Sequence, residues 1–342
     1  MPDIYPLRPT ATYQVAPVRE VWVTAPKRRL WLHLLLFALT VFTTLAVGAR
    51  LSHNYAHNRP AYDVESGVNP FSGLLADPGR LLDGLPFSAT LLAILLAHEL
   101  GHYLTCRYYG IAATYPYFIP APTIIGTMGA FIRIQSPIVS RRALFDVGVS
   151  GPLVGFLLAL PVLALGIANS KVISSPHFSG TVNFGNPLLV LLLDKLLHPG
   201  VSPFNIYLHP MARAAWVGLF ATALNLLPVG QLDGGHIVYA LDRRWHRRVS
   251  RLVVVALAAP MLLLALSWAL ASWAPSLGPA AELIENHYWF GWFVWALLLL
   301  LLGIRHPAVL DPVPLNRGRR LVALGALAIF LLCFTPIPFA TR

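Results

Sequence analysis

Long apolar runs alternate with short polar segments along this chain of 342 residues. A helix needs about 20 consecutive apolar residues to cross the hydrocarbon core of a bilayer. The alternation therefore predicts an all-α polytopic membrane protein with about seven transmembrane helices. These helices are expected at residues 30–49, 85–108, 143–168, 211–227, 252–273, 288–304 and 321–334.

The segment between residues 111 and 137 departs from this helical pattern. Prolines and glycines interrupt any long helix there. They are Pro116, Pro120, Pro122, Gly126 and Gly129. Residues 117–119 and 130–134 are nevertheless apolar and strand-like. Because irregular backbone at membrane depth needs protein or a water-filled cavity to satisfy its hydrogen bonds, we expect a re-entrant β-hairpin over 116–134. A loop lying on the lipid headgroups is the alternative.

Composition favours a protein that lies in the lipid bilayer. The chain is 56% hydrophobic and 11% charged, whereas soluble domains carry about 25% charged residues. Its net charge of +11 comes from basic residues clustered between the apolar runs, and no nucleic-acid-binding module is recognisable, so we expect no nucleic-acid partner. The basic clusters fall on alternate sides of successive spans, which predicts a cytoplasmic amino terminus. Residues 1–29 would then form a polar cytoplasmic tail.

The second apolar run ends in an H-E-x-x-H motif, His98-Glu99-Leu100-Gly101-His102. Positions i and i+4 lie on one face of a helix, so His98 and His102 can bind one zinc ion. Glu99 lies one step further round the helix and can act as a general base on water at the metal. Polar groups at membrane depth cost about 2.5–3.5 kcal/mol each on insertion scales, and they usually mark function. The alternative is a set of polar residues packed inside a helix bundle.

A catalytic zinc site needs three protein ligands and a water molecule, so a third ligand must come from elsewhere. Asp233 is the best candidate, because few carboxylates occur in the apolar half of the chain. It follows the helix-breaking Pro228 and precedes Gly234 and Gly235, which allow close backbone approach. Asp233 could instead cap a helix, and His236 is a rival ligand. These residues indicate a membrane metallohydrolase.

The third apolar run carries small residues and one carboxylate that bear on packing. Gly148, Gly151 and Gly155 would let a neighbouring helix approach closely. Asp146 follows two arginines and is expected to be an interfacial or helix-start carboxylate, not a metal ligand.

Two motifs resemble those of the site-2 protease family of intramembrane zinc metalloproteases. They are His98–His102 and the stretch from Asn225 through Pro228 to Asp233 and Gly234. Residues 118–134, 143–152 and 334–339 are also similar to that family. The likeness is greatest to bacterial, chloroplast-type members that lack a PDZ domain, since residues 169–208 are too few to hold an extra globular domain.

The resemblance implies that residues 30–342 form an intramembrane metalloprotease domain acting on transmembrane protein substrates. His98, His102 and Asp233 would hold one Zn²⁺ per chain, and Glu99 would activate the water. Asn225 would contact the substrate backbone or the developing oxyanion, or else only bond to a neighbouring helix. The hairpin would pair with an unwound substrate segment by strand addition. We expect a bacterial plasma membrane, with the active site toward the cytoplasm.

Two other functions remain open from the residues. A prenyl-protease type of membrane zinc hydrolase would take a glutamate ligand from a later helix, but Glu282 and Glu285 fall in a loop on the predicted outer side. The second open function is that of a non-proteolytic membrane scaffold or transporter with a relic metal site. The sequence does not indicate an oligomeric state.

Overall fold

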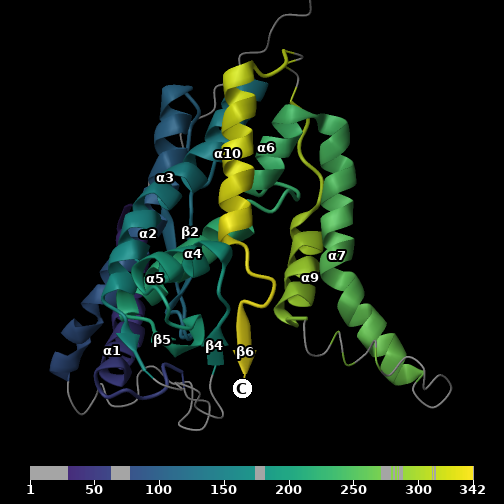
Figure 1. The fold of residues 1–342 in the computed structure, drawn as a ribbon. Helices are drawn as coiled ribbons and strands as arrows, with labels where there is room; N and C mark the ends of the chain where they lie inside the picture. Colours follow the sequence, from purple (N-terminus) through teal and green to yellow (C-terminus); the bar gives the residue numbers. More distant parts are fainter. Residues whose placement is uncertain are drawn as a thin grey trace, which may run out of the picture.

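Helices make up most of the chain that the structure describes (Figure 1). This computed structural model describes residues 30–62, 78–173, 182–270, 279, 282, 284, 288–309, 311 and 313–341. The α-helices are α1 (Leu30–Ala56), α2 (Leu85–Tyr108), α3 (Arg141–Ala168), α4 (Leu188–Leu197), α5 (Pro210–Asn225), α6 (Asp233–Leu241), α7 (Arg243–Ala269), α9 (Gly291–Leu302) and α10 (Arg317–Cys333). Two 3₁₀ helices are η1 (Pro78–Gly84) and η2 (Pro203–Asn205).

Short antiparallel strand pairs complete the described part of the chain. β1 pairs with β2, β3 with β5, and β4 with β6. The strands are β1 (Tyr117–Pro120), β2 (Thr127–Phe131), β3 (Lys171–Val172), β4 (Val182–Phe184), β5 (Ile206–Tyr207) and β6 (Phe339–Thr341).

Four helices are long and apolar enough to cross a membrane. They are Leu30–Ala56, Gly79–Tyr108, Arg141–Ala168 and Arg243–Ala269. Three further spans expected from the sequence correspond to shorter helices, α5, α9 and α10, of 16, 12 and 17 residues. A polytopic, mainly helical membrane protein is therefore confirmed, and the count of seven spans stays a prediction. The polar tail at residues 1–29 lies outside the described residues.

Helix α3 lies at the centre of the bundle and packs along α2, α5 and α6. Large side chains from these helices are fully buried between them, whereas the outer faces of the bundle expose leucines, as contact with lipid requires. The buried side chains include Phe87, Leu91, Ile94, Leu144, Phe145, Leu163, Ile167, Trp216 and Leu219. The exposed ones include Leu34, Leu157, Leu262, Leu263, Leu301, Leu324 and Leu327.

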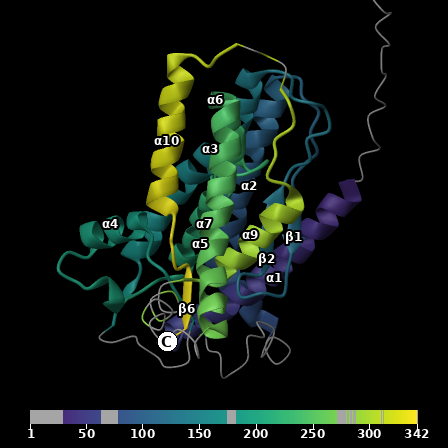
Figure 2. The same ribbon diagram turned by 90° about the vertical axis from the view of Figure 1, so that its right-hand side faces the viewer.

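A β-hairpin forms where the sequence predicts one and lies against α1 (Figure 2), and its re-entrant position in a membrane stays a prediction. Its register places Tyr117 opposite Phe131. At the turn, Thr43 of α1 donates its hydroxyl hydrogen to the Gly126 carbonyl at 2.6 Å. Gly126 has φ +84°, and a Cβ there would lie 2.7 Å from the Thr43 carbonyl oxygen, so only glycine fits. At the other end, the His33 ring stacks on Tyr117 with 3.9 Å between centroids. Helix α1 therefore holds both ends of the hairpin.

Asp146 of α3 joins helices that are far apart in the sequence. The Arg319 guanidinium at the start of α10 donates to both of its carboxylate oxygens, at 2.6 and 2.8 Å. Tyr109, just after α2, donates its hydroxyl hydrogen to the same carboxylate. The two arginines that precede Asp146 do not provide its partner; Arg141 instead donates to the carbonyl of Ala240. Asp146 thus clamps α10 to α2 and α3.

Candidate metal centre

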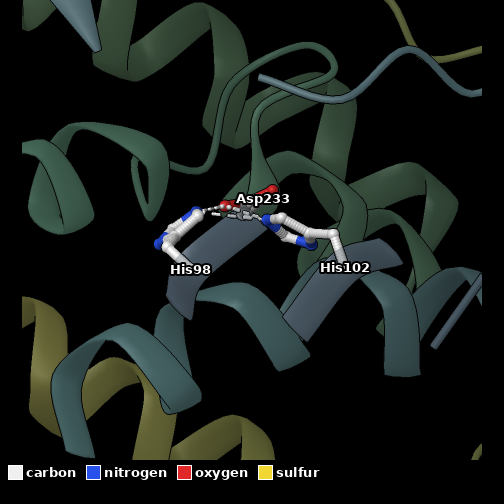
Figure 3. A group of neighbouring side chains, drawn as sticks. All are labelled: His98, His102 and Asp233. Atoms are coloured by element: carbon white, nitrogen blue, oxygen red, sulfur yellow. Dashed lines mark hydrogen bonds and ion pairs between the residues drawn. The ribbon is translucent and has the colours of Figure 1, made fainter. Parts of the chain in front are cut away.

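The H-E-x-x-H segment lies inside α2, and its two histidines point toward the first residue of α6 (Figure 3). His98 and His102 are 5% and 7% exposed. Asp233 approaches them from α6, after the tight turn that follows α5. His98 and Asp233, which are 135 positions apart in the sequence, therefore share one buried site. Among the described residues, this is the group of His, Cys, Asp and Glu side chains that could hold a metal ion.

The three donor atoms form a nearly equilateral triangle. The Nε2 atoms of His98 and His102 lie 3.1 Å apart, and Asp233 Oδ2 lies 3.2 Å from the first and 3.3 Å from the second. Ligands of a tetrahedral zinc ion with bonds of 2.0–2.1 Å lie roughly 3.3 Å apart. The triangle therefore matches three corners of a zinc tetrahedron, and the fourth corner is left for water or substrate. Two imidazoles and one carboxylate are also donors that zinc accepts.

A backbone carbonyl fixes the orientation of one ligand ring. His102 Nδ1 lies 2.7 Å from the carbonyl oxygen of Val147, in α3. A carbonyl can only accept, so Nδ1 carries the hydrogen and Nε2 keeps its lone pair for a metal. This contact is a feature of packing, and nothing in the sequence around Val147 indicated it.

Glycines on one face of α3 make room for the site. A Cβ at Gly151 would lie 2.1 Å from His102 Nε2, and one at Gly155 would lie 3.2 Å from the His98 Cβ. A Cβ at Gly148 would lie 2.7 Å from the His236 Cβ and 3.2 Å from the Asp233 carbonyl oxygen. The close approach expected at these three glycines is therefore confirmed. Gly151 and Gly155 admit the two histidine ligands, and Gly148 admits α6, the helix that carries Asp233.

The turn before α6 depends on Gly234 and Gly235, the two glycines that follow Asp233. A Cβ at Gly234 would lie 2.0 Å from the Leu226 carbonyl oxygen, and one at Gly235 would lie 2.5 Å from the Gly230 carbonyl oxygen. The chain can therefore fold back from α5 into α6 closely enough to deliver Asp233. Asp233 is the first residue of α6, not its cap: the N-cap is Leu232, and no side chain caps this end. The capping role considered for Asp233 is wrong.

Two further side chains named from the sequence lie at the same place. Glu99 is 5% exposed and lies on α2, next to His98. Strand β2 of the hairpin packs against this helix. Asn225, the last residue of α5, has its Nδ2 atom 3.3 Å from His98 Nε2.

His236, the rival ligand, is not in the triangle. Its Nδ1 atom lies 2.8 Å from Nε2 of His306, in the segment that joins α9 to α10. His306 did not stand out in the sequence, because it lies outside every motif and 70 residues from its partner.

A sequence model of the family described as Peptidase family M50 matches residues 86–267 of this chain. The chain belongs to peptidase family M50. The resemblance to the site-2 protease family is thereby confirmed. The matched stretch runs from α2 to α7 and contains both halves of the metal centre, His98 and His102 on one side and Asp233 on the other.

Chloroplast proteins are among its relatives. The protein named probable zinc metalloprotease EGY1, chloroplastic, of Oryza sativa subsp. japonica is 32% identical over 234 residues, which are 64% of this chain and 39% of that protein. The probable zinc metalloprotease EGY2, chloroplastic, of Arabidopsis thaliana is 32% identical over 218 residues, 60% of this chain and 38% of that protein. The chain thus spans about two fifths of the length of these curated relatives. No solved structure matches the chain significantly.

The glycine face of α3 generates a direct test. In Gly151→Ala, the new methyl group would lie 2.1 Å from His102 Nε2, so the ring or α3 must move and the donor triangle must open. We expect zinc affinity to fall by at least about tenfold, the loss typical when the support of a metal ligand is removed. Affinity is measured by chelator competition on the purified full chain. Gly325→Ala on α10 is the matched control, because nothing lies within 4 Å of its Cβ position. Unchanged affinity in Gly151→Ala would contradict this account of the glycine face.

Proposed function

We propose that this chain is an intramembrane zinc metalloprotease that hydrolyses peptide bonds of transmembrane proteins. The observation that carries the proposal is the triangle of His98, His102 and Asp233 donors beside the buried Glu99, between helices long enough to cross a membrane. Membership of peptidase family M50 and relatives named as zinc metalloproteases support the same reaction.

Each residue of the site has a task in this reaction. His98, His102 and Asp233 would hold one zinc ion, which when bound polarises the scissile carbonyl and lowers the pKa of water. Glu99 accepts the proton of the attacking water. It then returns that proton to the nitrogen of the leaving amine, as the peptide C–N bond breaks. Glu99 is buried and follows His98 directly on α2, which places it beside the donor triangle.

Asn225 would bind the substrate on the side of His98. Its amide nitrogen lies 3.3 Å from His98 Nε2, so the N–H groups are close to the metal centre. A donor at this distance can bind the substrate carbonyl and stabilise the negative charge that develops on it. A hydrogen bond between helices α5 and α2 alone is the simpler role for the same contact.

The hairpin would present the substrate as an added strand, in a re-entrant position in the membrane. Backbone hydrogen bonds flank the bridge between Ala113 and Ile134, so the N–H and C=O of Ile134 point away from the first strand. Strand β2 packs against α2, the helix that carries His98, Glu99 and His102. The edge of β2 opposite its β1 partner would then lie close to the metal centre, where an unwound substrate could pair with it.

The arrangement in the membrane follows from the charges. We place the basic segments and the metal centre toward the cytoplasm, with about seven spans, in a bacterial plasma membrane. The arginines at the start of α7 and α10 would lie at this cytoplasmic end. Membership of this family and the intact donor triangle favour neither alternative, the prenyl-protease type of hydrolase or the scaffold with a relic metal site.

Removing one ligand tests the donor set. His98→Ala, His102→Ala or Asp233→Ala leaves two donors, so each variant is expected to lose most of its bound zinc and all proteolysis. Bound zinc is measured by mass spectrometry of the purified protein, and cleavage with a transmembrane substrate in detergent or nanodiscs. Asp83→Ala removes an exposed carboxylate outside the site and serves as control. A full equivalent of tightly held zinc in Asp233→Ala would exclude Asp233 as a ligand.

Changing Glu99 separates zinc binding from chemistry. Glu99→Gln keeps the size of the side chain and one oxygen that can accept a hydrogen bond, but it cannot take a proton from water. We expect a full complement of zinc, cleavage lower by about 10²–10⁴-fold, and uncleaved substrate retained on the protein. The measurements are zinc content, single-turnover cleavage and substrate co-purification. Wild-type turnover in this variant would disprove the role of Glu99 as general base.

A proline scan over 130–134 tests substrate pairing. A proline at a position whose N–H lies on the outer edge should lower cleavage while zinc content and expression stay nearly intact. Alternate positions should differ, because a proline at a position whose N–H bonds to the first strand disrupts the hairpin itself. Ala130→Val keeps the N–H and is the matched control. If every variant of the scan cleaves like wild type, the segment does not present substrate and the surface-loop alternative holds.

A further inference from the structure

The segment that joins α9 to α10 runs past α6, the helix that carries Asp233 (Figure 1). Residues 303–309 of this segment are called the strap here. His306 of the strap lies 2.8 Å from His236 and stacks on Tyr239, with 4.1 Å between ring centroids. The Val309 N–H donates to the Tyr239 hydroxyl at 3.3 Å. His236 and Tyr239 follow Asp233 by three and six positions, so the strap contacts successive turns of α6.

Helix α6 depends on such contacts for its position. It has only nine residues, and isolated helices below about 12–15 residues are marginally stable. Its first turn has no side-chain cap. At its other end, Arg141 of α3 donates to the Ala240 and Leu241 carbonyls at 2.7 and 2.9 Å. One turn from the candidate ligand, His236 lies between α3, where a Cβ at Gly148 would come within 2.7 Å of its Cβ, and His306 of the strap.

The direction of the histidine pair is set by the backbone. His306 Nδ1 lies 2.7 Å from the Pro307 carbonyl oxygen, which can only accept, so Nδ1 carries the hydrogen. His306 Nε2 is then the acceptor, and His236 Nδ1 donates to it. Both rings are held by this chain of bonds, which begins on the strap backbone and ends on α6.

We propose that His306 is a positioning residue for Asp233: by accepting the hydrogen bond of His236, it holds α6 where the Asp233 carboxylate meets His98 and His102. The inference rests on the proposed metal site and assigns His306 no contact with substrate or reacting atoms. Metal sites need ligands held within about 0.5 Å, and supporting hydrogen bonds of this kind typically change metal affinity by 10–100-fold.

Three substitutions of His306 separate its hydrogen bond from its packing. His306→Ala removes both the acceptor and the stack on Tyr239. His306→Phe keeps an aromatic ring on Tyr239 but has no acceptor. His306→Gln supplies a carbonyl oxygen that can accept from His236. We expect zinc affinity, measured by chelator competition on the full chain, to fall about tenfold or more in the first two variants and to recover substantially in the third. Arg305→Gln, an exposed change next to it on the strap, is the control and should bind zinc like wild type.

A double-mutant cycle tests whether the two histidines act as a pair. If His306 acts through His236, then His236→Ala and His306→Ala together lower zinc affinity no more than the larger single effect. Additive losses, or wild-type affinity in His306→Ala and His306→Phe, overturn the positioning role. A general loss of stability would also overturn the positioning role. In that case His306→Phe and His306→Gln would lose zinc affinity equally, and the melting temperature of the zinc-free protein would fall.

The same measurements distinguish this inference from the proposed protease function. Variants with wild-type zinc affinity count against His306 alone and leave the protease proposal intact. Wild-type protein that binds zinc but cleaves no transmembrane substrate counts against the protease proposal alone, because zinc affinity is the readout here. Zinc binding that survives Asp233→Ala excludes Asp233 as a ligand and overturns this inference, whereas the protease proposal is decided by the cleavage assay.

Discussion

Three donor atoms within 3.3 Å of one another, in the apolar interior of a helix bundle, are the constraint on which the rest of the structure depends. Lone pairs and negative charge at that separation repel unless a proton or a metal cation lies between them, and a buried site holds little water to screen them. The surrounding chain must therefore hold the donors in place. It does so with a glycine face on α3, a carbonyl that orients His102, and a short helix that brings in Asp233.

The two sides of the centre are supported differently. His98 and His102 lie on a helix of 24 residues whose own hydrogen bonds fix their spacing. Asp233 lies at the start of a helix of nine residues, so its position is set by neighbours: the turn after α5, Arg141 of α3, and the strap with His306. A long helix is a rigid support, whereas a short one takes its place from tertiary contacts.

Parts of the chain outside the family match complete the site. The match covers residues 86–267. Helix α1 precedes it and holds the hairpin through His33 and Thr43; the strap and Arg319 follow it. The hairpin in turn packs through β2 against α2, the helix that carries Glu99. The elements that carry the chemistry are thus the matched ones, and the elements that steady them come from both flanks.

The sequence by itself determined the features that rest on local spacing. The i, i+4 pair of histidines, the hairpin between prolines and glycines, the small face of α3 and the turn before Asp233 all follow from backbone geometry over a few residues. Tertiary structure decided which distant groups meet. Asp146 pairs with Arg319 and not with the arginines next to it in the sequence. His236 is hydrogen-bonded to His306, and the Val147 carbonyl accepts a hydrogen bond from His102. These contacts join segments 45 to 173 residues apart, and their partners are selected by the packing of whole helices, which no local pattern of apolar and polar residues records.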